Sequence, residues 1–168
     1  MDRRVRGIAL DVDGVLTDGS FWWGPNGEEM KRFHFLDVMG IARARRGGVV
    51  FALISGEESP LVGRFAIKLG ITDVYAGCRD KAAAVRAFAE KYGFDLSDIC
   101  FMGDDVNDLP AMAIVGVTAA PSNAHFTVRD HVAITTVSPG GSGAVRELID
   151  DLAARGLVKV VYDSPARG

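Results

Sequence analysis

Acidic side chains, one serine and one lysine stand directly after the apolar segments of this sequence. An aspartate pair follows the first segment, a serine follows the second, three aspartates follow the fourth, and a lysine begins the helix predicted after the third. In chain order these residues are Asp11, Asp13, Ser55, Lys81, Asp104, Asp105 and Asp108. Open parallel α/β sheets bind ligands at the carboxyl ends of their strands, so we expect these side chains to meet at one edge of a sheet.

Such a group of carboxylates predicts a metal site. Unpaired carboxylates a few ångströms apart repel one another, and the repulsion raises the pKa of at least one of them. A hard divalent cation removes this conflict, and an oxygen-rich set without histidine suits Mg²⁺. Together with the hydroxyl of Ser55 and the ammonium of Lys81, the metal would neutralise and orient a phosphoryl group that a carboxylate can attack.

Each of these residues taken alone has a plainer structural interpretation. A single aspartate at the end of a strand is usually a turn or cap residue, and Ser55 before a glycine would alone indicate a turn. Trp22 and Trp23, on a predicted hairpin, are more often packing residues than a platform for a substrate. The joint placement of the acidic residues, Ser55 and Lys81 is what favours a functional site.

The apolar runs alternate with helical patterns along the chain. Strands are predicted at residues 5–10, 49–54, 73–75 and 99–102, with weaker candidates at 116–119 and 131–135. Helices are predicted at residues 37–46, 59–69, 80–92, 107–113 and 143–155. Asp37 is the expected N-cap of the first helix, and Ser59 before Pro60 is expected to begin the second. This alternation predicts an α/β fold, a Rossmann-like parallel sheet with helices on both faces.

One segment interrupts this alternation. Aromatic-rich runs at residues 20–23 and 28–35 flank a turn that contains Asn26-Gly27, a pair typical of a β-hairpin. The insert, about residues 20–35, follows the first strand and is too short to form a cap domain. We expect residues 1–156 to form a single domain, and residues 157–168 to be a C-terminal tail without predicted structure.

The composition fits one globular domain. The 168 residues are 48% hydrophobic and 24% charged, with a formal net charge of −3. No basic excess or basic stripe is present to hold nucleic-acid phosphates, and no apolar run approaches the ~20 residues of a membrane span. Cys78 and Cys100 show neither a CxxC nor a zinc pattern and are expected to be reduced thiols. We therefore expect a cytoplasmic protein without a nucleic-acid or membrane partner.

Residues 11–19, DVDGVLTDG, closely resemble the first motif of haloacid dehalogenase-type phosphatases. More narrowly, the chain resembles the small capless branch that dephosphorylates 3-deoxy-D-manno-octulosonate 8-phosphate and related nonulosonate 9-phosphates. The resemblance extends from about residue 8 to residue 148 and implies the fold of that superfamily without a cap domain. It continues in register through Asn26-Gly27-Glu28, Asp37, Gly40-Ile41, Ile54-Ser55-Gly56, Lys81, Gly103-Asp104-Asp105, Asp108, Gly140-Gly141, Gly143-Ala144 and Arg146-Glu147.

The resemblance implies a role for each matched residue. Asp11 would be the nucleophile that becomes an aspartyl phosphate, and Asp13 would protonate the leaving sugar oxygen and then activate water. Asp11, the main-chain carbonyl of Asp13, and Asp104 would bind Mg²⁺. The remaining assignments are phosphoryl contacts for Ser55 and Lys81, and supporting roles for Thr17, Asp105 and Asp108, the last as the partner of Lys81.

Two positions leave the sugar open. The octulosonate branch usually carries arginine after the Ser-Gly pair, where this chain has Glu57, and often a basic residue where it has Ser142. Glu57 together with Lys68 is more similar to phosphatases that act on 2-keto-3-deoxy-nononate 9-phosphate. A glutamate can accept hydrogen bonds from sugar hydroxyls, whereas arginine favours a carboxylate. The candidate substrates are an octulosonate 8-phosphate, a nonulosonate 9-phosphate, or a broad range of phosphosugars.

Two further interpretations belong to other functional classes. Receiver domains also place acidic residues, a hydroxyl and a lysine around Mg²⁺, but their phosphorylated aspartate follows a later strand than their acidic pair. Related domains joined to cytidylyltransferases serve in assembly, but this chain retains every expected catalytic group.

In the capless branch, neighbouring subunits form part of the wall of the active site, commonly in a homotetramer. The aromatic hairpin with Phe33 and Phe35 is suitable for such an interface.

Overall fold

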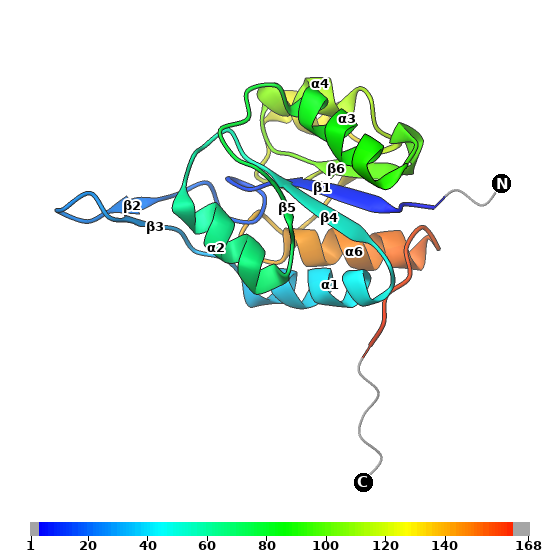
Figure 1. The fold of residues 1–168 in the computed structure, drawn as a ribbon, viewed down its shortest axis with the longest axis horizontal. Coiled ribbons are helices and arrows are strands. Elements are labelled where there is room, and N and C mark those ends of the chain that lie inside the picture. The colour runs from blue at the N-terminus through cyan, green and yellow to red at the C-terminus, as the bar shows by residue number, and fades with distance from the viewer. Residues whose placement is uncertain (1–3, 163–168) are drawn as a thin grey trace, which may run out of the picture.

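Six parallel strands form the central sheet of the molecule, which the computed structural model describes for residues 4–162 (Figure 1). The strands are β1 (Gly7–Asp11), β4 (Val50–Ile54), β5 (Asp73–Tyr75), β6 (Ile99–Met102), β7 (Val117–Ala120) and β8 (Ile134–Thr135). Their order across the sheet is β5-β4-β1-β6-β7-β8. The chain builds outward from β1 to one side and then, from β6, to the other. The carboxyl ends of β1, β4 and β6 therefore flank the crevice where such sheets bind ligands.

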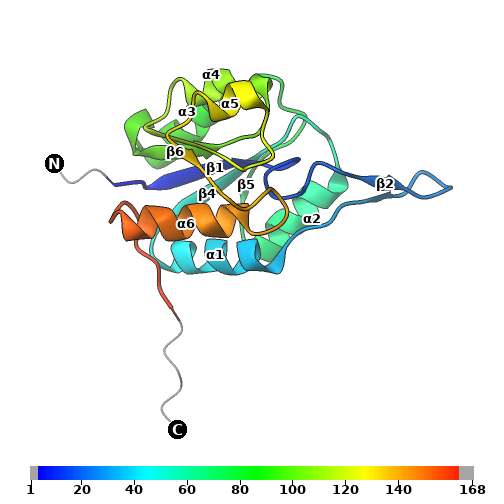
Figure 2. The same cartoon turned by 180° about the vertical axis from the view of Figure 1, so that it is seen from behind.

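Helices cover both faces of this sheet, as the alternation predicts. On one face lie α1 (Phe35–Arg46), α2 (Pro60–Leu69) and α6 (Ala144–Ala154), and on the other lie α3 (Lys81–Tyr92), α4 (Leu109–Met112) and α5 (Phe126–Arg129) (Figures 1 and 2). Two short 3-10 turns, η1 (Leu96–Asp98) and η2 (Val106–Asp108), precede β6 and α4. The sequence does not predict α5 or η1, because elements of three or four residues are too short to show a period.

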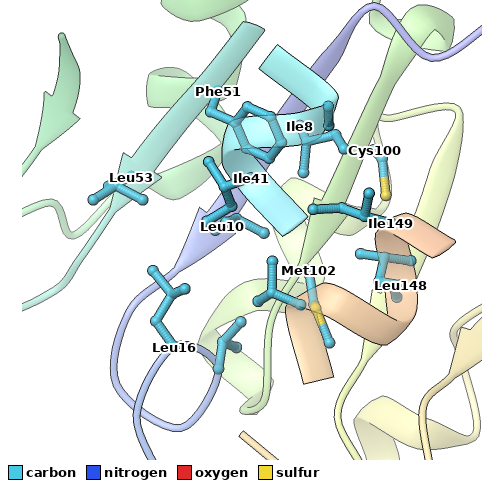
Figure 3. Packing of buried hydrophobic residues seen from close by; sticks show 14 of the residues in the cluster. Ile8, Leu10, Leu16, Ile41, Phe51, Leu53, Cys100, Met102, Leu148 and Ile149 are labelled. Atoms are coloured by element: carbon cyan, nitrogen blue, oxygen red, sulfur yellow. The ribbon is translucent and has the colours of Figure 1, made fainter. Parts of the chain in front are cut away.

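The core consists of two apolar layers, one on each face of the sheet. Successive residues of a strand point to opposite faces, so each strand contributes to both layers. The layer under α1 and α6 includes Ile8, Leu10, Ile41, Phe51, Leu53, Cys100, Met102, Leu148 and Ile149 (Figure 3). The layer under α3 and α4 includes Ala9, Ala52, Ile54, Val85, Phe88, Ile99, Phe101 and Met112. Because the residues of these strands are buried on both faces of the sheet, the strands appear in the sequence as continuous apolar runs.

The ends of α2 and α3 follow the predicted start and stop signals. The Ser59 hydroxyl accepts a hydrogen bond from Leu61 N at 3.3 Å. Gly70 ends α2 in the left-handed conformation, with φ at 65°. Asp80 caps α3 through Ala83 N at 2.9 Å. Such caps are each worth ~1 kcal/mol, and the cap of α3 places the first residue of that helix at the carboxyl edge of the sheet.

The prediction that Asp37 caps α1 is wrong. The Nδ1 atom of His34 accepts the capping hydrogen bond from Leu36 N at 3.2 Å. Asp37 is fully buried, and its Oδ1 accepts a hydrogen bond from Arg146 N at 2.9 Å. Burial raises the pKa of Asp37, although backbone N–H groups at the start of α6 lower it. Asp37 therefore caps α6, whose own N-cap is Gly143, and ties the two helices together.

The predicted hairpin is present but shorter than expected. Strand β2 (Trp22–Trp23) pairs antiparallel with β3 (Glu29–Met30), and the pair projects from the body of the molecule (Figure 1). Phe35, predicted within the hairpin run, is instead the first residue of α1. Phe33 stacks on Phe65 of α2, with ring centroids 3.8 Å apart. Phe35 therefore belongs to a helix, where it remains 65% exposed. Phe33 is partly buried against the protein's own core and does not lie in the exposed hairpin.

The outer part of the hairpin is apolar and exposed. Phe21 is 51% exposed, Trp22 49%, Trp23 70% and Met30 57%. Trp22 and Trp23 therefore do not have the predicted packing role within a single chain.

Beyond α6 the chain turns back toward the amino end of the sheet. Val5 N donates to Leu157 O at 2.9 Å, and Val161 N donates to Arg43 O at 3.2 Å. The described part of the predicted tail is thus hydrogen-bonded to the segment before β1 and to α1. Residues 1–3 and 163–168, which belong to the predicted domain and tail, lie outside the described residues. Within residues 4–162, no helix is both long and apolar enough to cross a membrane.

Candidate active site

Asp11 is the last residue of the central strand. Because β1 is hydrogen-bonded to β4 on one side and to β6 on the other, the backbone that carries Asp11 is fixed. The Asp11 side chain is nearly buried, and its Oδ1 accepts a hydrogen bond from Val12 N at 2.8 Å. Asp13 follows two residues later, with its side chain 30% exposed. Val12 between them is fully buried, and it anchors the turn that carries both carboxyl groups.

Thr17 and Gly14 shape the loop after β1. The Thr17 hydroxyl accepts hydrogen bonds from Gly14 N at 3.3 Å and from Gly19 N at 3.2 Å. Gly14 has a φ of 85°, and a Cβ at this position would overlap the carboxylate of Asp104. Glycine at position 14 therefore allows the Asp104 carboxylate, which follows β6, to lie against the loop that follows β1.

Lys81 and Asp108 form a buried ion pair beside Asp11. Lys81 Nζ lies 2.6 Å from Asp108 Oδ1 and 3.1 Å from Asp11 Oδ1. Asp108 Oδ2 accepts hydrogen bonds from the backbone N–H groups of Asp104, at 2.9 Å, and Asp105, at 3.2 Å. Burial lowers the pKa of Lys81, but Asp11 and Asp108 raise it more, so the ammonium stays charged at neutral pH. Both Asp108 oxygens are engaged, one by Lys81 and one by the loop after β6.

One carboxylate oxygen from each of Asp11, Asp104 and Asp108 lies within 4.8 Å of the other two. Burial and the charges of Asp108 and Asp104 raise the pKa of Asp11 well above its usual value, although Lys81 lowers it. Burial likewise raises the pKa of Asp104 to about 6. Three carboxylates against one ammonium leave an excess of negative charge that a divalent cation fits. Because Asp108 is already engaged, Asp11 and Asp104 are the carboxylates best placed to bind that cation.

A cavity of about 250 Å³ opens over this cluster. It is lined by Asp11, Asp13, Gly19, Gly56, Glu57, Lys81, Asp104, Asp105 and Asn107. Asp105 also caps η2 through Val106 N at 2.7 Å. Ser55 is fully buried, and its hydroxyl accepts a hydrogen bond from Glu57 N at 3.1 Å. The end of β4 thus presents Gly56 and Glu57 to the cavity, while the predicted phosphoryl ligand Ser55 lies behind them.

A second cavity, of about 200 Å³, lies against the hairpin. It is lined by Asp13, Gly19, Phe21, Trp23, Glu29, Lys31 and Glu57. Asp13, Gly19 and Glu57 line both cavities, so a ligand can extend from the acidic cluster to the aromatic hairpin. Lys68 lies exposed on α2 and lines neither of these cavities, so the structure does not bring it to the site of its own chain.

Two residues that the sequence does not single out contact this site. Lys31 Nζ lies 2.6 Å from Asp13 Oδ1. Asn123 Nδ2 donates to Gly14 O at 3.0 Å, and its Oδ1 accepts from Gly140 N at 2.6 Å, so it joins the loop after β1 to the glycine loop before α6. The double glycine that begins at Gly140 signals a close backbone approach. A single lysine or asparagine in a polar segment carries no comparable signal.

The chain matches the family described as haloacid dehalogenase-like hydrolase over residues 54–148. The 3-deoxy-D-manno-octulosonate 8-phosphate phosphatase of Escherichia coli K12 is 38% identical over 146 residues, which are 87% of this chain and 78% of that protein. The chain belongs to the haloacid dehalogenase-like hydrolases. This haloacid dehalogenase-like hydrolase is a phosphoric monoester hydrolase, which confirms the predicted family and enzyme class.

Solved structures share the fold of this haloacid dehalogenase-like hydrolase. The octulosonate 8-phosphate phosphatase of Yersinia pestis is 34% identical, with a TM-score of 0.88 over 94% of this chain and 87% of that one. The enzyme of Moraxella catarrhalis, in complex with a magnesium ion, a phosphate ion and a KDO molecule, is 34% identical with a TM-score of 0.86 over 89% and 87%. The predicted fold is confirmed, and no cap domain is present within residues 4–162. Because the chain belongs to the haloacid dehalogenase-like hydrolases, the interpretation as a receiver domain is wrong.

Proposed function

We propose that this chain uses Mg²⁺ to hydrolyse the phosphomonoester of a 2-keto-3-deoxy sugar acid through an aspartyl-phosphate intermediate. The observation that carries the proposal is the convergence of Asp11, Asp104 and the Lys81–Asp108 pair on one cavity at the carboxyl edge of the sheet. Asp13 stands between this cavity and the one at the hairpin, where the sugar would lie.

Mg²⁺ would be held by Asp11, the main-chain carbonyl of Asp13, and Asp104. When bound, it supplies the positive charge that the carboxylate cluster lacks and polarises a phosphoryl oxygen. Lys81, kept charged by its two carboxylate neighbours, would bind the phosphoryl group through its ammonium. Ser55 holds the turn that faces the cavity, and its proposed phosphoryl contact requires its hydroxyl to rotate away from the Glu57 backbone.

The supporting residues act on backbone segments. Thr17 fixes the loop after β1 through two backbone hydrogen bonds. Asp105 lines the cavity and caps η2. Asp108 holds Lys81 and, through two further hydrogen bonds, the loop that carries Asp104.

The reaction consists of two displacements at phosphorus. In the first, an Asp11 oxygen attacks phosphorus, the ester P–O bond breaks, and Asp13 gives its proton to the leaving sugar oxygen. In the second, water attacks phosphorus, Asp13 takes a proton from that water, and the P–O bond to Asp11 breaks. Inorganic phosphate and the free sugar acid leave, with Asp13 protonated again and Asp11 again a carboxylate. Because the transition state is loose and highly charged, the residues act mainly by positioning and charge neutralisation.

An octulosonate 8-phosphate is the first candidate substrate, because the curated and structural relatives at 38% and 34% identity are named for it. Glu57 favours a second candidate, a nonulosonate 9-phosphate such as 2-keto-3-deoxy-nononate 9-phosphate. Glu57 lines both cavities, where its carboxylate can accept hydrogen bonds from sugar hydroxyls, and the nine-carbon acid offers one hydroxyl more than the eight-carbon acid.

Phosphate release with Mg²⁺ tests this proposal on a panel of octulosonate 8-phosphate, nononate and N-acetylneuraminate 9-phosphates, and hexose phosphates. We expect kcat/KM on one sugar-acid phosphate to exceed that on hexose phosphates at least about 100-fold, because the site would pair with groups that hexoses lack. Similar rates on every compound would indicate a broad phosphosugar phosphatase. No turnover by folded protein with Mg²⁺ would indicate an assembly domain like those joined to cytidylyltransferases.

Glu57→Arg is expected to shift the preference toward octulosonate 8-phosphate. A guanidinium can pair with the carboxylate that both acids carry, but it cannot accept the hydrogen bond that Glu57 would accept from the additional hydroxyl of the nononate. The ratio of kcat/KM for the octulosonate over the nononate should therefore rise about 10-fold or more. Glu58→Arg is the matched control, because Glu58 is exposed and lines neither cavity. Its ratio should stay unchanged. If Glu57→Arg gives the wild-type ratio as well, Glu57 does not select the sugar.

Stabilisation by Mg²⁺ should depend on pH. The pKa of Asp104 is raised to about 6 in the fold, so protons compete with the cation as the pH falls through that value. A raised carboxyl pKa also means that the metal-free fold loses stability as the pH rises through it, because the unfolded chain has already released that proton. Excess MgCl₂ should therefore raise Tm by several degrees more at about pH 8 than at about pH 5. Thermal unfolding with and without EDTA measures this, and equal gains at both pH values would contradict a metal site at Asp104.

A second copy of the chain is the proposed partner of the hairpin. Phe21, Trp22, Trp23 and Met30 form an exposed apolar surface beside the hairpin cavity, and burying it against another copy would wall the open site. Lys68 could then contribute to sugar choice only at the site of a neighbouring copy. The expected assembly is a homotetramer, which sedimentation velocity measures directly.

A further inference from the structure

Lys31 places a buried ammonium at the edge of the site, and the reaction described above does not use it. The residue follows β3, and its side chain is only 3% exposed. Its Nζ lies 2.6 Å from Asp13 Oδ1 and 3.6 Å from Glu29 Oε1. Burial lowers the pKa of Lys31, but Asp13 and Glu29 raise it more. Lys31 is therefore a cation that connects the hairpin to the loop after β1.

Glu29 connects this ion pair to the body of the protein. Its Oε1 accepts a hydrogen bond from Ser59 Oγ at 2.9 Å, and Ser59 is the N-cap of α2. An isolated lysine–aspartate pair on a surface fixes little. Here the lysine is buried and its second carboxylate partner is held by a helix terminus. The Asp13 carboxyl is thus anchored through Lys31 and Glu29, although it belongs to a loop.

The position of Asp13 gives this anchor a consequence for catalysis. Asp13 lines both the cavity over the acidic cluster and the cavity at the hairpin, so the ester oxygen between phosphorus and sugar would lie near it. A proton donor must be within hydrogen-bond reach of the oxygen that it protonates, and a misplacement of about 1 Å can cost about 100-fold in rate. The Asp13 side chain is 30% exposed, so without a partner it has staggered rotamers that point to solvent.

We propose that Lys31 is a positioning residue for the leaving-group step, because it holds the Asp13 carboxyl at the junction of the two cavities. The hairpin then contributes to the chemistry and not only to the outer wall of the site. This inference rests on the proposed role of Asp13 as the acid. Lys31 lines the hairpin cavity and not the cavity over the acidic cluster, so its effect on the reacting atoms passes through Asp13.

Two aryl phosphates with different leaving groups test this role. Phenyl phosphate and p-nitrophenyl phosphate differ by a nitro group that stabilises the departing phenolate, so phenyl phosphate depends far more on a proton at the leaving oxygen. The value of kcat/KM reports the steps up to the first irreversible one, transfer to Asp11, and leaves out the later hydrolysis. We expect Lys31→Met to lower kcat/KM about 10- to 100-fold for phenyl phosphate and about threefold or less for p-nitrophenyl phosphate.

Two controls separate positioning from structural damage. Lys91→Met removes a lysine–aspartate pair of the same 2.6 Å length, to Asp73 at the amino end of β5, and should leave both values unchanged. Trp22 and Trp23 are the two tryptophans of the chain, so an unchanged fluorescence emission shows that the hairpin of the variant is intact. If Lys31→Met alters that emission, Lys31→Gln decides the matter. Because its amide keeps a hydrogen-bond donor for Asp13, its loss on phenyl phosphate should be smaller than that of Lys31→Met, and its loss on p-nitrophenyl phosphate should stay about threefold or less.

Equal losses on the two substrates, or no loss on either, would overturn the proposal. Asp13→Asn separates its failure from that of the proposed function. If Asp13→Asn shows the selective loss on phenyl phosphate and Lys31→Met does not, the role of Lys31 is wrong while that of Asp13 stands. If Asp13→Asn shows no selective loss, the assignment of Asp13 as the acid fails, and the role of Lys31 fails with it.

Discussion

Asp11→Asn should abolish phosphate release, with a fall in kcat/KM of at least about 10³-fold. The amide has no anionic oxygen to attack phosphorus, and it offers the metal a neutral ligand in place of a charged one. The replacement keeps the shape of the side chain, and its amide oxygen can still accept the hydrogen bond from Val12 N. Phosphate release with Mg²⁺ on the best substrate of the panel is the assay, and retained turnover would refute the nucleophile assignment.

The same substitution should not destabilise the metal-free protein. Burial and the charge of Asp108 raise the pKa of Asp11, so the fold disfavours the ionised form, and stability is lost as the pH rises through the raised pKa. A neutral amide removes that loss, so without metal at about pH 8 the variant should have a Tm equal to or above the wild-type value. Asp151→Asn, in an exposed pair with Arg155, is the control for both assays and should change neither.

The boundaries of a helix are predictable from sequence where cap and stop residues flank a long periodic apolar pattern. Ser59, Pro60 and Gly70 mark both ends of α2 through contacts within a few positions of each other, and the structure confirms them. Asp37 has the right residue type for a cap, but its partner N–H belongs to Arg146, 109 positions away. Sequence periodicity cannot show which helix end a buried aspartate will reach, because that depends on how α1 packs against α6.

The candidate site is predictable to the same extent. Asp11, Lys81 and Asp104 meet because a parallel sheet brings the carboxyl ends of its strands to one edge, and the alternation of strands and helices in the sequence predicts such a sheet. Details that depend on side-chain direction or on an irregular loop are not predictable in this way. The Ser55 hydroxyl faces its own turn, and Lys31 reaches Asp13 only because the hairpin packs beside the loop after β1.

Asp108→Ala should cause a loss of stability of about 3–5 kcal/mol in the free energy of unfolding. The Asp108 side chain is fully buried and pairs with Lys81, whose side chain is 3% exposed. Removing the carboxylate leaves a buried ammonium with Asp11 alone, at 3.1 Å. It also leaves the backbone N–H groups of Asp104 and Asp105 without their acceptor. The loop that carries Asp104 should loosen for this reason, so Mg²⁺ binding and kcat/KM should fall together with stability.

Urea unfolding at neutral pH measures this loss, and two further variants make the result interpretable. Asp151→Ala breaks an exposed pair with Arg155 and should cost about 0.5 kcal/mol or less. Asp108→Asn should lose less stability than Asp108→Ala, because its amide oxygen can still accept from the Asp104 and Asp105 backbone, while its NH₂ group faces Lys81 without attracting it. If Asp108→Ala is as mild as the exposed control, the Lys81–Asp108 pair does not organise the site. If alanine and asparagine cost the same, the pair with Lys81, rather than the hydrogen bonds to the loop, accounts for the whole effect.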